Sequence, residues 1–285
     1  MRSIRLLLIA CCLVSACAAP NQTATSTAAA APSAGMAKTE VLWLGQATFR
    51  IRTPGGKVIV IDPWLQTNPK TPAEYKKLDA LGKVDLILVT HGHFDHFGDA
   101  VELAKMNNAP MWAPAGLNQS LQVMGVLPAN LAPRMSKGGT VLPFGAGGIK
   151  IMQVHAEHSS EAVWKNPTTG KDEMMIGGEP IGWIVELENG YKIYHMGDTG
   201  LFGDMKLIGE RYKPDLLLIP IGNHFVMGPE DAAYATREWL KPKVAVPMHY
   251  GTIPQLRGTP QEYLNALGTT STKVEVMQPG DKLTF

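Results

Sequence analysis

The sequence is poor in cysteine: it has three in 285 residues, and all three lie within the first 17 positions. The rest of the chain therefore has no cysteine with which to form a disulfide or to bind a metal as a thiolate. The sequence also lacks an excess of either charge, since it has 26 Lys and Arg residues and 25 Asp and Glu residues. This balance leaves no broad basic surface, so no nucleic-acid partner is expected.

The apolar run at the N-terminus is short. It covers residues 6–14, far fewer than the roughly 20 residues that a membrane-spanning helix needs. The run follows two arginines and precedes small residues, which is the pattern of a secretory signal peptide. The sequence VSAC at 14–17 also resembles the bacterial lipobox, in which the cysteine becomes the lipidated first residue of the mature protein.

We therefore expect residues 1–17 to be a signal peptide with a lipobox, and Cys17 to carry lipid. The protein would then be an exported, periplasmic or cell-envelope lipoprotein of a bacterium, in contact with a membrane only through its N-terminal lipid anchor. A plain signal peptide that is cleaved nearby is the alternative.

The chain changes character twice after this segment. Residues 18–38 are small and polar, with no branched aliphatic or aromatic side chain, and are predicted to form a flexible tether because they cannot bury enough apolar surface to offset ordering. Residues 39–285 alternate apolar runs with turn signals, and they are numerous enough for one domain with a substantial core.

Two parts of this domain echo each other in the order of their elements. TFRIRTPGGKVIVIDPWL and GWIVELENGYKIYHMGDTGL each read as strand, glycine turn, strand and aspartate. The segments that follow, VDLILVTHGHFDHFGDA and PDLLLIPIGNHFVMGPEDA, each read as a buried strand, a glycine-containing loop and a helix. The repeat predicts an α/β fold, an αββα sandwich of two similar halves. Chance similarity between two βαβ-like segments is the alternative.

Histidine is also scarce, with eight residues, and every one lies near the end of a predicted strand. Strand ends that lead into loops are where α/β sheets build their sites. Three histidines fall in THGHFDHFGD, residues 90–99. Along an extended segment His91 and His93 face the same way, so both could bind one ion. A helical turn after them would bring Asp95 and His96 close to the same end of the strand, where they could bind a second ion. The alternative is that this segment is a solvated loop.

The same segment resembles the metal-binding signature of the metallo-β-lactamase superfamily. From about Glu40 to the C-terminus the chain is similar to the small metal-dependent hydrolases of the UPF0173 and lactonase-like branch, through HMGDTGLFGDMKLIGE, PIGNHFVMGPEDA and VPMHYGT. The resemblance implies a metallo-β-lactamase-like hydrolase domain over residues 39–285 that holds two metal ions. It also implies the following ligands: His91, His93 and His158 for the first ion, Asp95, His96 and His249 for the second, and Asp198 as a bridge.

His155 competes with His158 for the third ligand position. We prefer His158 because Ser159 and Ser160 follow it, as small residues follow this ligand in the family. Five imidazoles and two carboxylates suit Zn²⁺, although Mn²⁺ and Fe²⁺ also accept this set of ligands. The expected cofactors are therefore two divalent ions, with zinc as the first choice.

Further polar residues accompany the predicted ligands. Asp62, in IDPW, is expected to orient a ligand imidazole, and His195 to be packed beside the site rather than to bind metal. His224 could protonate a leaving group or hold an oxyanion, or it could be structural. Gln46 stands where the relatives usually carry a histidine, and an amide cannot titrate near neutral pH. Residues 161–180 are either a flap over the site or an exposed hairpin.

The predicted activity is hydrolysis of an ester, lactone or phosphodiester bond in a small molecule. A hydroxide bound between the two ions would attack the carbonyl or phosphoryl centre, with Asp95 holding it in line. One alternative is a metal-binding lipoprotein that senses or carries a ligand without turnover. Another is a di-iron redox enzyme, but relatives of that kind generally have glutamate at the position of His93 and a flavin domain.

Overall fold

The computed structural model describes residues 37–166 and 168–285. The predicted signal peptide, the lipobox with Cys17 and the predicted tether up to residue 36 lie outside the described residues, so they stay predictions. Within the described part, no helix is both long enough and apolar enough to cross a membrane.

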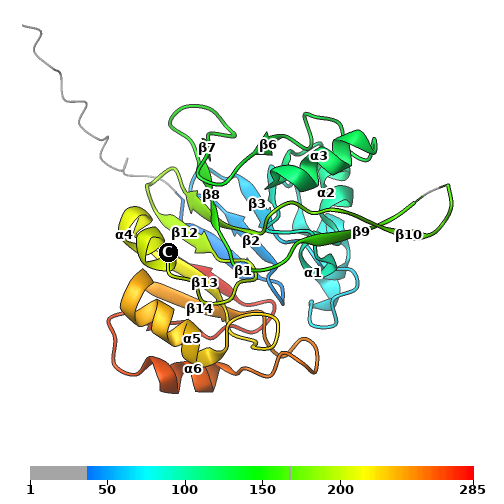
Figure 1. Cartoon of the computed structure of the whole chain (residues 1–285). Coiled ribbons are helices and arrows are strands. Elements are labelled where there is room, and N and C mark those ends of the chain that lie inside the picture. Colours follow the sequence, from blue (N-terminus) through cyan, green and yellow to red (C-terminus); the bar gives the residue numbers. More distant parts are fainter. Residues whose placement is uncertain (1–36, 167) are drawn as a thin grey trace, which may run out of the picture. The chain divides into compact units, whose positions relative to one another are not determined.

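Two seven-stranded sheets form the centre of the fold (Figure 1). In the first sheet β1, β2 and β3 are antiparallel neighbours, and β3 to β6 run parallel. Its strands, in spatial order, are β16 (Lys282–Thr284), β1 (Glu40–Trp43), β2 (Phe49–Arg52), β3 (Val58–Ile61), β4 (Leu86–Leu88), β5 (Met111–Pro114) and β6 (Arg134–Met135).

The second sheet repeats this arrangement. Its antiparallel strands β8, β11 and β12 are followed by parallel neighbours β13, β14 and β15. In spatial order the strands are β15 (Lys273–Val274), β14 (Val244–Met248), β13 (Leu216–Pro220), β12 (Lys192–His195), β11 (Ile181–Glu186), β8 (Lys150–His155) and β7 (Thr140–Val141). The pair β2–β3 with parallel β4 thus matches β11–β12 with parallel β13, and the predicted sandwich of two similar halves is confirmed.

Helices cover the outer face of each sheet. The first sheet carries two 3₁₀ turns and three α-helices: η1 (Ala73–Lys76), η2 (Leu78–Leu81), α1 (Phe94–Phe97), α2 (Ala100–Asn107) and α3 (Ala115–Val123). The second carries α4 (Met205–Tyr212), α5 (Pro229–Tyr234), its π-helical continuation η3 (Ala235–Leu240) and α6 (Pro260–Leu267).

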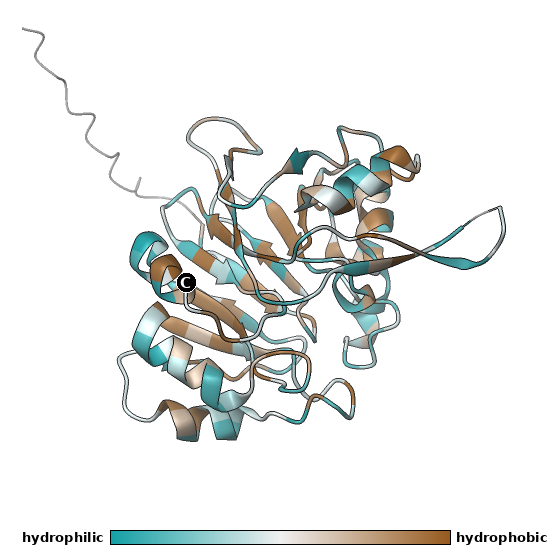
Figure 2. Cartoon of the chain, in the orientation of Figure 1, coloured by the Kyte–Doolittle hydropathy of each residue, from teal (hydrophilic) through white to brown (hydrophobic). Residues whose placement is uncertain are grey.

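Side chains along each strand point alternately to the other sheet and to the helices, which explains why two sheets and two helical layers form. In β3, Ile59 and Ile61 point into the core between the sheets, while Val58 and Val60 pack under the helices. In β13, Leu216 and Leu218 face the other sheet while Leu217 packs under α4–α6. Strands that are buried on both faces have continuous apolar sequences. In Figure 2 the strands of both sheets are largely brown, with teal at their polar residues.

One hairpin lies outside this layered arrangement. Strands β9 (Glu161–Lys165) and β10 (Asp172–Ile176) pair only with each other and extend away from the two sheets (Figure 1). Val163 and Met174 face each other across the pair, and both are exposed. Of the two possibilities for residues 161–180, this arrangement favours the exposed hairpin over a flap.

Candidate metal centre

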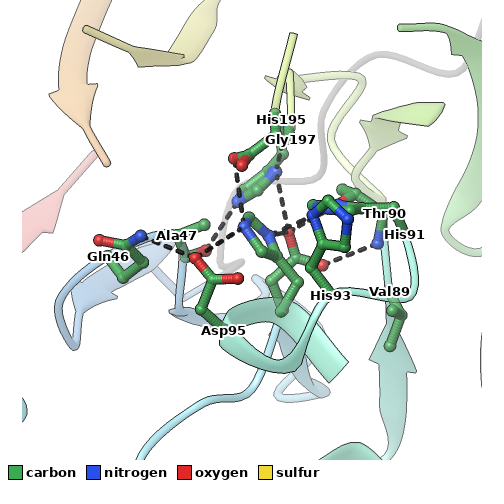
Figure 3. A network of polar contacts seen from close by, with 12 residues as sticks. Gln46, Ala47, Val89, Thr90, His91, His93, Asp95, His195 and Gly197 are labelled. Carbon is green, nitrogen blue, oxygen red and sulfur yellow. Dashed lines mark hydrogen bonds and ion pairs between the residues drawn. The ribbon is translucent and has the colours of Figure 1, made fainter. Parts of the chain in front are cut away.

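The predicted ligands follow the ends of four strands. Figure 3 labels three of them, His91, His93 and Asp95, beside Gln46 and His195. The THGHFDHFGD segment follows β4, His158 follows β8, Asp198 follows β12 and His249 follows β14. Strands β8 and β12 run in the same direction because β11, between them, is antiparallel to both. Their C-terminal ends, with that of parallel β14, therefore reach one edge of the second sheet, opposite the loop that leaves the first sheet.

Three histidines form the first group of potential ligands. His91 Nε2 lies 3.0 Å from His93 Nδ1, and His158 Nε2 lies 3.3 Å from the same atom. His91 is fully buried, whereas His93 and His158 are partly exposed. Their nitrogens come together closely enough to hold one metal ion.

Asp95, His96, Asp198 and His249 form the second group. His96 Nε2 and His249 Nε2 lie 3.3 Å apart, and Asp198 Oδ1 lies 3.1 Å and 3.0 Å from them. Asp95 Oδ2 is 3.3 Å from His249 Nε2. All of these except Asp95 are buried.

Asp198 lies between the two groups. Its Oδ2 is 3.6 Å from His158 Nε2, while its Oδ1 faces His96 and His249. One carboxylate therefore presents an oxygen to each group. The seven residues that the sequence and its family resemblance pointed to come together in a single cluster.

The spacing of the donor atoms matches that of ligands around a metal ion better than that of groups hydrogen-bonded to each other. Asp198 Oδ1 is buried without a hydrogen-bond partner among the described residues, although two imidazole nitrogens lie about 3 Å away. Ligands bound tetrahedrally to Zn²⁺ at 2.0–2.1 Å are separated by about 3.3 Å. The spacing and the missing hydrogen bonds both match atoms that point at a common centre.

Hydrogen bonds on the far side fix which ring nitrogen faces the cluster. Asp62 accepts from Thr90 N, from Thr90 Oγ1 and from His96 Nδ1, all at 2.7 Å. Thr90 Oγ1 in turn lies 3.0 Å from His91 Nδ1. Asp62 thus orients His96 directly and His91 through Thr90, which leaves both Nε2 atoms free to bind a metal.

Glu161 is a partner that the sequence did not reveal. Its Oε2 lies 3.1 Å from His93 Nε2, so the outer nitrogen of this ring also has an acceptor. Glu161 begins β9, only three residues after His158. Its position so soon after a predicted ligand was the only sign in the sequence of a contact between Glu161 and the site.

Three histidines lie outside the cluster. His195 is buried, donates from Nε2 to the carbonyl of Ala47 at 2.8 Å and accepts from Gly197 N at 3.2 Å, so it packs beside the site as expected. His155 instead contacts Lys137 and Glu157. The structure does not bring the exposed His224 to the cluster.

Two glycines in the metal-binding segments allow close packing. A Cβ on Gly92, between His91 and His93, would lie 2.9 Å from the Cβ of Ala162 in β9. Gly197 has a φ of +64°, and a Cβ there would lie 2.7 Å from that of Thr90. Larger residues at either position would push the segments apart.

The residues around the site adopt strained backbone conformations. Gln46, Asp62 and His249 have left-handed φ values of 50°, 48° and 56°. Such residues persist only where their surroundings fix them. The backbone carbonyl of Gln46 accepts hydrogen bonds from Trp43 Nε1 and from His249 N, both at 3.1 Å. The side-chain Nε2 of Gln46 lies 2.8 Å from both Asp95 Oδ2 and His249 Nε2.

The carboxylates and imidazoles of the cluster shift one another's pKa values. Burial opposes ionisation of Asp198, but His249 and His96 outweigh it and hold the pKa of this carboxyl well below its usual range. Burial likewise opposes protonation of His249, yet Asp198 and Asp95 raise its pKa to about 9. The pKa of His96 is raised well above its ordinary value because Asp198, Asp95 and Asp62 outweigh its burial. Both rings therefore carry protons at neutral pH where a metal would bind.

Five residues of the cluster line a cavity of ≈ 350 Å³, namely His93, Asp95, His158, Asp198 and His249. The remaining wall contains mainly apolar side chains, namely Phe94, Phe225, Ile253 and Leu256. These residues were missed in the sequence because each lies in a short loop or first helical turn, where no periodic pattern marks the face that points to a site.

Comparison with known proteins agrees with this geometry. Residues 57–250 match the profile of the β-lactamase superfamily domain. A UPF0173 metal-dependent hydrolase of Polaromonas sp. is 66% identical over 248 residues, 87% of this chain and 90% of that protein. The chain belongs to the metal-dependent hydrolases of the metallo-β-lactamase superfamily.

Other members of the family support the assignment over the same region. A UPF0173 metal-dependent hydrolase of Cupriavidus necator is 61% identical over 96% of this chain and 95% of its own length. Among solved structures, a metallo hydrolase from the archaeon Ignicoccus hospitalis superposes with a TM-score of 0.73 at 34% identity, covering 87% of this chain and 99% of its own. The metallo-β-lactamase fold expected from the sequence is thereby confirmed.

Replacing Asp62 by asparagine should weaken metal binding by this family member about 10–100-fold, the usual cost of losing a partner that orients a ligand. Asparagine has one acceptor oxygen where Asp62 serves three hydrogen bonds, so a donor would be left unpaired. The matched control is Asp85→Asn. Asp85 also accepts a hydrogen bond from a backbone N–H, that of Val58, but it precedes β4, whereas the metal-binding segment follows this strand. Zn²⁺ affinity, measured by competition with a chelating dye, should fall only in the first variant.

Metal affinity should also rise with pH. His249, with a pKa of about 9, and His96, whose pKa is raised, must each lose a proton before Nε2 can bind a cation. Proton release favours binding at higher pH, so affinity should increase from about pH 6.5 and level off only above about pH 9, where most His249 rings have lost this proton before the metal binds. The same competition assay, corrected for protonation of the dye, measures this slope, and an affinity that stayed constant over the range would contradict it.

Proposed function

We propose that this chain is a hydrolase that binds two divalent cations, with Zn²⁺ as the first choice, and cleaves an ester, lactone or phosphodiester bond of a small molecule. The observation that carries the proposal is Asp198, one buried carboxylate that faces two separate groups of donors. Sites with two metals 3.5–4 Å apart use such an arrangement to activate water and to bind the oxygens of the reacting group.

Each group of donors would hold one ion. His91, His93 and His158 would bind the first through Nε2, Nδ1 and Nε2, as the mutual distances of these atoms indicate. Asp95, His96 and His249 would bind the second, with Asp198 shared between the two. When bound, the cations would supply a water of lowered pKa and would polarise the bond to be cleaved.

The protein's own residues position the reactants. Gln46 donates from Nε2 to Asp95 Oδ2 at 2.8 Å and so fixes this carboxylate in the lining of the cavity. The second oxygen of Asp95 would then accept a hydrogen bond from the attacking water and hold it in line with the substrate. Because Gln46 does not titrate, this orientation would not depend on its protonation.

The choice of His158 over His155 can be tested directly. His158→Ala should reduce the bound metal from two ions to one, because it removes one of three donors from the first group. Hydrolysis of a panel of esters, lactones and phosphodiesters should fall at least about 100-fold, since both ions are needed to bind the reacting oxygens. Metal content by elemental analysis and kcat/KM on the panel provide the two readouts.

His155→Ala is the matched control. It removes the same ring three residues away, where the structure places it against Lys137 and Glu157, so two ions and full activity should remain. Wild-type turnover should disappear when a chelator is added and return with Zn²⁺. Activity that survives metal removal would rule out the proposed chemistry, and metal binding without turnover would favour a sensor or carrier.

We also propose export and lipid anchoring at Cys17, on the evidence of the N-terminal sequence alone. Replacing Cys17 with serine should move the protein from the membrane fraction of bacterial cells to the soluble fraction, because serine cannot accept the thioether-linked lipid. Fractionation followed by immunodetection makes the measurement. A wild-type protein already in the soluble fraction would argue for a plain, cleaved signal peptide, and a variant that stays in the membrane fraction would argue for another attachment.

A further inference from the structure

The lining of the cavity at the metal centre combines two kinds of side chain. His93, Asp95, His158, Asp198 and His249 supply its polar part. Its apolar wall is made of Phe94, Phe225, Ile253 and Leu256, of which Phe94 is 67% and Phe225 is 49% exposed. Exposed phenyl rings beside a polar centre indicate contact with a molecule that has an apolar part.

The apolar wall is held firmly in place. Asn223 and His224 adopt left-handed φ values of 65° and 61°, and Asn223 N donates to the Met227 carbonyl at 3.0 Å, which closes a tight loop that carries Phe225. The neighbouring loop carries Ile253 and Leu256 and is closed by Gly251 N donating to the Leu256 carbonyl at 2.9 Å.

Hydrogen bonds also join these loops to each other and to the site. Gly258 N donates to the Gly222 carbonyl at 3.1 Å, and Met227 N donates to the carbonyl of Thr199, the neighbour of Asp198, at 2.9 Å. On the other side, the ring of Phe94 packs edge-on against Trp64, with 5.4 Å between the ring centres. The wall is thus preformed, so an apolar ligand need not order it on binding.

The charged and titratable side chains that line the cavity all belong to the metal cluster. Among the described residues that line it, none is a lysine or an arginine, and the two polar side chains besides the cluster, Gln46 and Ser159, are uncharged. A negatively charged group held away from the metals would therefore lose its hydration without gaining an ion pair. The lining favours a substrate whose remote part is neutral.

We propose that the substrate is a carboxylic ester or lactone with an apolar, uncharged acyl chain, which lies along Phe94, Phe225, Ile253 and Leu256 while its carbonyl group faces Asp198. This rests on the proposed hydrolytic function and selects among the bonds it allows. In the reaction, water adds its oxygen to the carbonyl carbon, the bond to the alkoxy oxygen breaks, and that oxygen takes up a proton. The products are a carboxylic acid and an alcohol, or one hydroxy acid from a lactone.

Linear alkyl hydroxamates test the apolar wall without requiring turnover. Their head group binds metal in the same way throughout the series, so binding to the Zn²⁺-loaded protein reports on the chain alone. From acetohydroxamate to octanohydroxamate, affinity should rise about two- to fourfold per methylene, the upper limit being complete burial of each group. A hydroxamate of similar length that ends in a carboxylate should bind no better than acetohydroxamate.

Phe225→Ser and Leu207→Ser form a matched pair of variants. Phe225 lines the cavity, whereas Leu207 is 62% exposed on α4 and lies outside it. Phe225→Ser should lower the affinity for octanohydroxamate about 10-fold, because it removes the apolar contact made by a large ring that is itself half exposed. Acetohydroxamate should bind it as tightly as the wild type, and Leu207→Ser should leave the whole series unchanged.

Hydrolysis of 4-nitrophenyl esters of increasing chain length completes the test. The proposal expects kcat/KM to rise with chain length alongside hydroxamate affinity, and to exceed that for bis(4-nitrophenyl) phosphate. Affinities independent of chain length, tighter binding of the carboxylate-ended compound, or a preference for the phosphate diester would overturn it and leave metal-dependent hydrolysis intact. A chain-length dependence without turnover of any ester would instead contradict the hydrolase while supporting an apolar ligand.

Discussion

A carboxylate buried among imidazoles constrains the rest of this structure. Asp198 is 3% exposed, and an ionised group at that depth costs free energy unless cations or hydrogen bonds compensate it. Protonated His96 and His249, whose pKa values the neighbouring carboxylates raise, can supply this compensation. Cations that replace those protons would supply a larger positive charge at the same position. The site is therefore arranged for positive charge, and protons and metals compete for it.

The fold brings this arrangement about by placing ligands on both halves of a repeated structure. The first sheet supplies the dense segment after β4, and the second supplies His158, Asp198 and His249 from three strand ends. Contacts between the halves fix their register: Ile181 N donates to the Thr90 carbonyl, and His249 N donates to the Gln46 carbonyl, both at 3.1 Å. The buried core between the sheets and the metal cluster at their edge thus depend on the same packing.

The sandwich and part of the cluster could be predicted from the sequence because they follow from side-chain alternation along a strand and from the repeated order of elements. His91 and His93 share a facing because extended chain alternates its side chains, and the echo between IVIDP and YHMGD exposed the duplicated halves. Spacing alone could not separate His155 from His158, because His155 ends β8 and the chain then leaves the strand. Glu161 and Phe225 escaped notice because they meet the site through a hairpin and a strained loop, whose positions depend on tertiary contacts.

Anomalous X-ray scattering from crystals grown with Zn²⁺ and measured at the zinc absorption edge tests the central claim most directly. The account predicts two peaks about 3.5–4 Å apart, one on either side of the Asp198 carboxylate. One peak should lie within bonding distance of His91, His93 and His158, and the other of Asp95, His96 and His249. A single peak, or zinc bound away from Asp198, would contradict the claim that one buried carboxylate organises two metal sites.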